Sequence, residues 1–126
     1  MNNKLLRPGS IVCAHYNAFQ GDDRVGLFCI LYDEQLDSSN NYKNNVFALK
    51  VTTNLRMANT YVVSANDGRN DFFEQDCLVC CSKVHIIDKE QIYKVLGTLH
   101  ASTLKNVYKV YRQFEREIER QIEDYF

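Results

Sequence analysis

The sequence lacks any long apolar run. No stretch of its 126 residues approaches the roughly 20 consecutive apolar residues that a membrane-spanning helix needs. Residues 1–6 lack the apolar core of a signal peptide, and the chain has no internal repeat and no low-complexity tract. These absences predict one globular domain over residues 1–126, with no membrane association and a cytoplasmic location.

The sequence also lacks a surplus of charge of either sign. Its 15 basic and 16 acidic residues give a formal net charge of -1, so the molecule as a whole does not have the strongly basic character typical of nucleic-acid-binding domains. The charges are unevenly distributed, because residues 115–126 contain five acids and two bases, which leaves 13 bases and 11 acids in the rest of the chain. The part before residue 115 is therefore weakly basic.

The five cysteines make an odd number, and each lies within an apolar segment. This placement predicts reduced core thiols without a structural disulfide. Cys77 and Cys80 have the C-x-x-C spacing of a zinc ligand pair. In an extended strand, however, they point to opposite faces, and no second pair exists. We therefore expect no zinc site at these cysteines, and we expect the protein to use no metal and no cofactor.

Five segments have the composition of β-strands. Residues 25–32 are apolar without alternation, which is typical of a strand covered on both faces. The other segments are shorter or are separated by turn-forming residues. The predicted strands are residues 10–18, 25–32, 46–53, 60–64 and 77–87.

The pattern changes to helical spacing after residue 87. Asp88 and Gln91 match a capping box, and the apolar residues that follow predict a short helix over residues 88–99. Ser102 or Thr103 can cap a second helix that reaches Tyr125. Its apolar stripe is Leu104, Val107, Tyr108, Tyr111, Phe114, Ile118 and Ile122.

The second helix would be roughly 34 Å long at 1.5 Å per residue, which is long for a small domain. Its end either projects and packs against a partner chain or lies along one face of the sheet. The predicted fold class is mainly β with C-terminal helices (α+β). It consists of a small, partly open antiparallel barrel over residues 8–87 and two helices over residues 88–126, the last one long.

Several segments, taken in order, resemble the MazF/PemK toxin family over about residues 7–114. The matching segments are Pro8-Gly9-Ser10-Ile11-Val12, Arg24, Val51-Thr52, Asp76-Cys77-Leu78-Val79, Lys83-Val84-His85-Ile86-Ile87-Asp88-Lys89 and Leu96-Gly97-Thr98-Leu99. The resemblance implies a barrel of the CcdB/MazF type, a homodimer, and metal-independent cleavage of single-stranded RNA. It also implies an antitoxin peptide as a partner, whose disordered tail occupies the RNA groove.

The resemblance places the family's catalytic arginine and threonine at Arg24 and Thr52. Strand alternation puts Thr52 on the same face as Lys50, while Thr53 shares the apolar face. Thr53 is therefore the weaker candidate for chemistry and is grouped with the RNA-binding residues. An ordinary β-branched strand residue is the alternative interpretation of Thr52.

Arg24 is better suited to holding a phosphate than to acting as a base, because a guanidinium loses a proton only above a pKa of about 12. An ordinary surface ion pair with Asp22 or Asp23 is the alternative. His85 is a candidate acid or base, since the unperturbed histidine pKa of about 6.5 is close to neutral pH. His85 also shares a strand face with Lys83. The alternative interpretation is that His85 is an ordinary half-exposed strand histidine.

The predicted RNA-binding residues are Lys50, Thr53, Arg56 and Lys83. Tyr61 or Phe72 could stack on a base, although aromatic residues at such spacing also occur in cores. Two departures from the family pattern bear on activity: Arg24 is followed by Val25 and not by proline, and Lys83 replaces the usual glutamine.

The function predicted from the sequence is a metal-independent endoribonuclease toxin of a toxin–antitoxin pair that cleaves single-stranded RNA or mRNA. A catalytically degenerate relative that binds a protein partner without cleaving RNA is the alternative. A relative of the gyrase poison CcdB is a third possibility, which no feature of the sequence favours.

Overall fold

The computed structural model describes residues 6–17, 23–33, 45–57, 61–65, 73 and 75–125. Six strands in these residues form one antiparallel sheet. The elements in chain order are β1 (Ser10–Asn17), β2 (Asp23–Asp33), β3 (Asn45–Thr52), the 3-10 turn η2 (Leu55–Met57), β4 (Val62–Ser64), β5 (Leu78–Asp88), the 3-10 turn η3 (Lys89–Gln91), β6 (Ile92–Thr98) and the helix α1 (Ala101–Tyr125).

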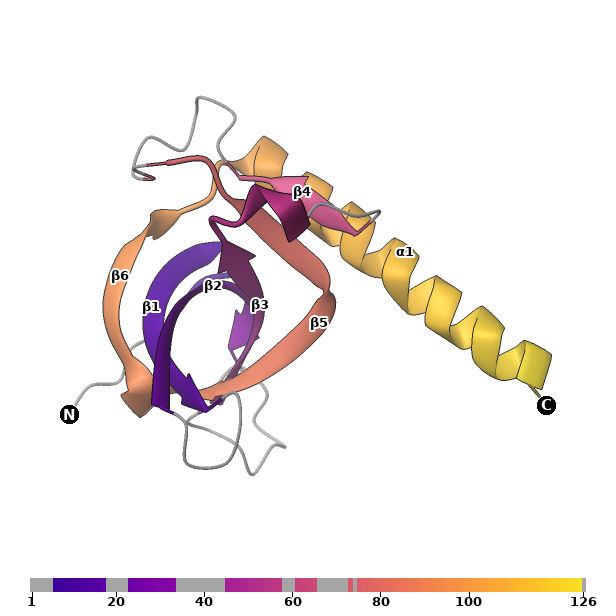
Figure 1. Cartoon of the computed structure of the whole chain (residues 1–126), viewed down its shortest axis with the longest axis horizontal. Coiled ribbons are helices and arrows are strands. Elements are labelled where there is room, and N and C mark those ends of the chain that lie inside the picture. Colours follow the sequence, from indigo (N-terminus) through magenta and orange to yellow (C-terminus); the bar gives the residue numbers. More distant parts are fainter. Residues whose placement is uncertain are drawn as a thin grey trace.

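The strands lie in the order β4-β5-β3-β2-β1-β6, so β4 and β6 are the two edges of a sheet that does not close. Strong curvature brings β6 and β5 to opposite sides of a ring whose wall also contains β1, β2 and β3 (Figure 1). The five predicted strands and the partly open antiparallel barrel are therefore confirmed.

Alternation along the strands divides the core into two clusters. The larger cluster lies against α1 and includes Ile11, Cys29, Leu49 and Val107. The smaller cluster lies on the opposite sheet face and consists of Leu6, Val12, Ala14, Phe28, Ile30, Val46, Ala48, Ile87 and Ile92. Successive residues of one strand thus belong to different clusters, as the two-residue strand period requires.

The sequence predicts core thiols at all five cysteines, and the structure confirms this for three of them. Cys29, Cys77 and Cys81 are buried, whereas Cys13 and Cys80 are half-buried. Burial raises the pKa of Cys29 and Cys81 to about 12 and that of Cys77 to about 11. These thiols stay protonated at neutral pH.

The predicted helix over residues 88–99 is wrong, because most of this segment is strand β6. The Asp88 carboxylate does accept a hydrogen bond from the Glu90 N–H at 2.9 Å, but this cap supports only the single turn η3. From Ile92 onward the backbone pairs with β1. Backbone pairing with an open sheet edge thus prevails over the helical spacing of the apolar side chains. The chain has one C-terminal helix, not two.

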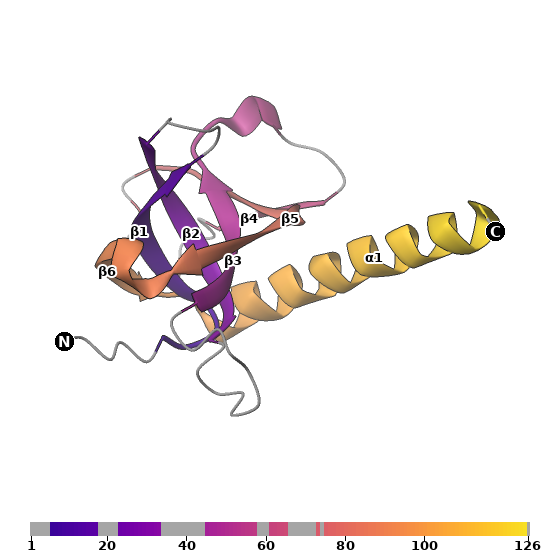
Figure 2. The same ribbon diagram turned by 90° about the horizontal axis from the view of Figure 1, so that it is seen from below.

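The long helix is confirmed, although its cap is His100, not Ser102 or Thr103. The ring Nδ1 of His100 accepts the Ser102 N–H at 3.2 Å. Its 25 residues give α1 a length of about 37 Å. Its first half packs against β4 and β5, while its second half extends away from the sheet, so the projecting arrangement is the one observed (Figure 2). No helix in the described ranges is long and apolar enough to span a membrane.

Gly9, just before β1, contacts β2, the link between β6 and α1, and α1 itself. Its N–H donates to the Ile30 carbonyl at 2.7 Å, and its carbonyl accepts the Leu99 N–H at 2.9 Å. Its φ of 89° lies in the left-handed region, which side chains rarely adopt. A Cβ here would also lie only 3.0 Å from Cδ2 of Leu104. Gly9 thus fixes where β2, β6 and α1 meet.

We expect Gly9→Ala to lower the free energy of unfolding by about 1–3 kcal/mol, because alanine is strained at positive φ. Urea unfolding monitored by circular dichroism measures this loss. Ser64→Ala, at an exposed position of β4, is the control and should change the value by no more than about 0.5 kcal/mol. Equal effects of the two substitutions would contradict the assigned role of Gly9.

Candidate nucleic-acid interface

A lysine lies over two aromatic rings on the sheet face of the smaller core cluster. The Nζ of Lys50 is 4.5 Å from the ring centroid of Tyr16 and 5.1 Å from that of Phe28. Both distances are within the range of cation–π attraction. The rings therefore hold an ammonium group at a defined position above β1, β2 and β3.

Gly26 makes room for this ammonium group. A Cβ at residue 26 would lie 2.2 Å from the Lys50 Nζ and 3.0 Å from Cε1 of Tyr16. Any larger residue would therefore displace the lysine from its place above the rings. The Arg24-Val25-Gly26 segment thus contributes a space at Gly26 as well as the Arg24 side chain.

His85 of β5 borders the same cluster. Its ring makes edge contacts with Phe28 and Tyr16, with centroids separated by 5.3 Å and 6.2 Å. Burial lowers the pKa of His85 below its ordinary value of 6.5, and the positive charges of Lys83 and Lys50 lower it further. The imidazole is therefore neutral at neutral pH and can accept a proton. We call Tyr16, Phe28, Lys50 and His85 the cationic cluster.

Arg24 lies on the sheet face of the cationic cluster. It is the cross-strand partner of Tyr16, and strand alternation puts it on the same face of β2 as Gly26 and Phe28. Its side chain is exposed. The guanidinium is therefore accessible to a ligand that approaches Lys50 from solvent.

Thr52 ends β3 two residues after Lys50, and both side chains are half-buried, whereas Val51 between them belongs to the core cluster against α1. This pattern agrees with the predicted common face of Lys50 and Thr52. The Thr52 Oγ1 accepts the Asn54 N–H at 3.1 Å. This bond uses an acceptor site of the hydroxyl, so its proton can still be donated to a ligand.

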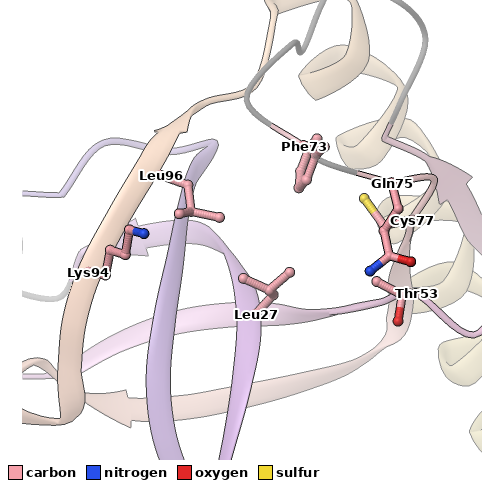
Figure 3. Close-up of a pocket in the computed structure, with 7 residues that line it drawn as sticks. All are labelled: Leu27, Thr53, Phe73, Gln75, Cys77, Lys94 and Leu96. Carbon is pink, nitrogen blue, oxygen red and sulfur yellow. The ribbon is translucent and has the colours of Figure 1, made fainter.

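Thr53 points to the other side of the sheet, where it lines a pocket of about 230 Å³. Figure 3 shows side chains of β2 and β6 on one side of this pocket and those of Thr53 and residues before β5 on the other. The lining residues are Leu27, Thr53, Phe73, Gln75, Cys77, Lys94 and Leu96. An ammonium, an amide and a hydroxyl thus surround a partly apolar space on the sheet face opposite to the cationic cluster.

The remaining predicted RNA-binding residues, Lys83 and Arg56, lie on different elements, and the charge of Lys83 acts on His85 of the cationic cluster. Lys83 is exposed, and it lies in residues 80–83 of β5, which form a bulge opposite Lys50. Arg56 is exposed in η2, where its N–H donates to the Asn54 Oδ1 at 3.1 Å. Tyr61 contacts Phe114 of α1, with ring centroids 5.3 Å apart, so it does not join the cationic cluster. Phe72 lies outside the described residues.

Tyr16, Gly26, Phe28 and Lys94 were missed as site residues from the sequence. An aromatic residue in an apolar strand carries no signal that a lysine lies over its ring. For Tyr16, strand alternation gives a partial signal, because it places this side chain on the face of β1 opposite to Cys13. Lys94 was missed because its segment was assigned to a helix.

The arrangement can hold a phosphate and move a proton. Arg24, Lys50 and the Thr52 hydroxyl can donate hydrogen bonds to an anion, and the neutral His85 can accept a proton. Among the described residues, no group of histidine, cysteine and carboxylate side chains could hold a metal ion.

Replacing Lys50 by methionine removes a positive charge that lowers the pKa of His85, so we expect this pKa to rise. Titration of the His85 Cε1–H signal by NMR, assigned with His85→Asn, measures the change. Lys105→Met, at an exposed position of α1, should leave the pKa unchanged. An unchanged or lower pKa in Lys50→Met would show that Lys50 does not act on His85.

Comparison with known proteins identifies the fold. No protein-family model matches the sequence, and no curated protein matches it either. The structure is similar to the Mycobacterium tuberculosis toxin MazF-mt6, with a TM-score of 0.65 and 20% identity over 85% of this chain and 96% of that one. It is also similar to a chain of a MazE-MazF crystal structure from Deinococcus radiodurans, with a TM-score of 0.65 and 10% identity over 93% of this chain and 98% of that one.

A third similar structure is an endoribonuclease in complex with its cognate antitoxin from a mycobacterial species. Its TM-score is 0.64, with 13% identity over 84% of this chain and 90% of that one. Identities this low establish the three-dimensional arrangement and leave the activity to be argued from the residues. The chain has the MazF-like fold, in agreement with the family resemblance of its sequence.

Proposed function

We propose that the protein is a metal-independent endoribonuclease toxin that cleaves single-stranded RNA or mRNA and is held inactive by an antitoxin peptide. The observation that carries the proposal is the placement of Arg24, Lys50, Thr52 and a neutral His85 on one sheet face. The MazF-like fold of the chain, shared with endoribonuclease toxins, supports it.

In this mechanism the His85 imidazole takes the proton from a ribose 2′-hydroxyl. The 2′ oxygen attacks the adjacent phosphorus, and the bond from phosphorus to the 5′ oxygen breaks, leaving a cyclic phosphate. Arg24 and Lys50 stabilise the extra negative charge on the phosphate, while the Thr52 hydroxyl donates to one of its oxygens. The leaving 5′ oxygen takes its proton from water or from the Lys50 ammonium.

The pocket lined by Thr53 supports the proposal that the substrate is single-stranded. Its phenyl ring, amide, hydroxyl and ammonium suit an unstacked base, which a duplex does not offer. The positive charges around Lys50 also suit the carboxylates of an acidic antitoxin tail. We further propose that the toxin acts as a homodimer in the cytoplasm.

A non-catalytic protein-binding module is the second candidate. It is favoured by Val25 in place of the family's usual proline after the catalytic arginine, and by the contacts of the His85 ring with Phe28 and Tyr16, which a purely structural histidine would also make. In such a module the cationic cluster would bind an acidic peptide without cleaving RNA.

We expect the wild-type protein to cleave a mixed-sequence single-stranded RNA in excess EDTA. Arg24→Ala and Thr52→Ala should each lower the cleavage rate by about 10²-fold or more, because each removes a donor to the phosphate. Denaturing gel electrophoresis of the RNA measures the rates. Lys105→Ala, on the exposed surface of α1, is the matched control and should cleave like the wild type.

The pH dependence gives a second readout. Cleavage should decline only below pH 6.5, since the neutral form of His85 is required and its pKa is lowered from 6.5. Intact RNA after incubation with folded wild-type protein would argue against the nuclease and favour the protein-binding module. Cleavage that is unaffected by both alanine substitutions would show that the reaction occurs elsewhere.

A further inference from the structure

The apolar stripe of α1 continues beyond the part of the helix that the sheet covers. Val107 is completely buried, whereas Ile118 is 39% exposed and Ile122 is 53% exposed. Figures 1 and 2 both show the C-terminal half of α1 extending away from the barrel. The chain thus keeps core-type side chains on a helical segment that its own sheet leaves uncovered.

A hollow of about 320 Å³ lies where this segment leaves the sheet. Its apolar walls are Val84 of β5 and Tyr111, Phe114 and Ile118 of α1. Ile86 follows two residues after Val84, on the same face of β5, and is 63% exposed. The uncovered helix stripe and the exposed apolar part of β5 therefore form one surface.

This surface has an acidic rim. Glu115 and Glu119 are the charged side chains that line the hollow. The basic residues of the segment face elsewhere, because Arg116 and Arg120 line a different hollow beside Tyr61. Arg120 is also bound to both carboxylate oxygens of Glu117, at 2.7 Å and 3.0 Å. We call Val84, Ile86, Phe114, Glu115, Ile118 and Glu119 the α1–β5 surface.

We propose that the α1–β5 surface binds a basic amphipathic segment of a partner protein. Apolar side chains of that segment enter the hollow, and flanking lysines or arginines pair with Glu115 and Glu119. A second copy of this chain fits poorly, since antiparallel pairing of two α1 helices about Ile118 would place these glutamates against each other. The proposal does not depend on RNA cleavage.

Two labelled helical peptides test the charge preference in the full-length protein. One consists of leucines at helical spacing with lysines between them, and the other has glutamate at every lysine position. We expect the lysine peptide to bind, with fluorescence anisotropy as the readout, and to shift backbone amide NMR signals of residues 111–125 and 83–87. The glutamate peptide should bind at least about tenfold more weakly. Added salt should weaken binding of the lysine peptide, because it screens the charges.

Variants test the site itself. Two double variants should each weaken binding of the lysine peptide by at least about tenfold. One combines Glu115→Lys with Glu119→Lys, and the other combines Ile118→Ser with Ile122→Ser. Glu90→Lys, at an exposed position of η3, is the matched charge control and should bind as the wild type does. Because the replaced side chains are exposed or partly exposed, circular dichroism should show an unchanged fold.

The proposal is overturned if neither peptide binds, if both bind equally, or if the control weakens binding as much as the double variants do. It is also overturned if sedimentation shows a dimer of the wild-type protein that Ile118→Ser with Ile122→Ser dissociates, because a second copy would then occupy the surface. Failure of RNA cleavage leaves all of these readouts unchanged, so the two proposals are tested separately.

Discussion

The double pairing of β1 determines how the rest of the chain is arranged. β1 lies between β2 and β6. The backbone of Gly9, just before β1, bonds to Ile30 within β2 and to Leu99 just after β6. This pairing carries β6 around the ring until Lys94 faces Thr53 across a pocket. It also fixes the start of α1, whose Leu104 lies directly over Gly9.

Most strands could be predicted from the sequence because their signals are local. Apolar runs, turn residues and a two-residue alternation all occur within short windows. β6 could not be predicted in this way, since its residues have helical spacing and a capping motif. What makes it a strand is the open edge of β1, about 80 residues earlier in the chain. No local pattern reports such a distant pairing.

The candidate site also contains residues that local sequence patterns predict and residues that they do not. Arg24 and Thr52 follow from the order of family-like segments, and Lys50 follows from its strand parity with Thr52. The partners of Lys50 do not, because the place of Tyr16 and the space above Gly26 depend on the registers between β1, β2 and β3. The lowered pKa of His85 likewise arises from burial and from charges on two strands. The sequence thus predicts which groups can react, whereas the registers between the strands determine which side chains and charges surround them.

The uncovered half of α1 affects the dynamics of the chain. Side chains such as Val107 and Tyr108, whose hydroxyl donates to the Leu31 carbonyl, anchor the first turns, but beyond Ile118 the helix is held mainly by its own backbone bonds. A helical segment of that length is marginal in water by itself. Its amide protons should therefore exchange with solvent well before those of the anchored turns. Any ligand that covers the segment would slow this exchange, so the local unfolding equilibrium itself reports on occupancy.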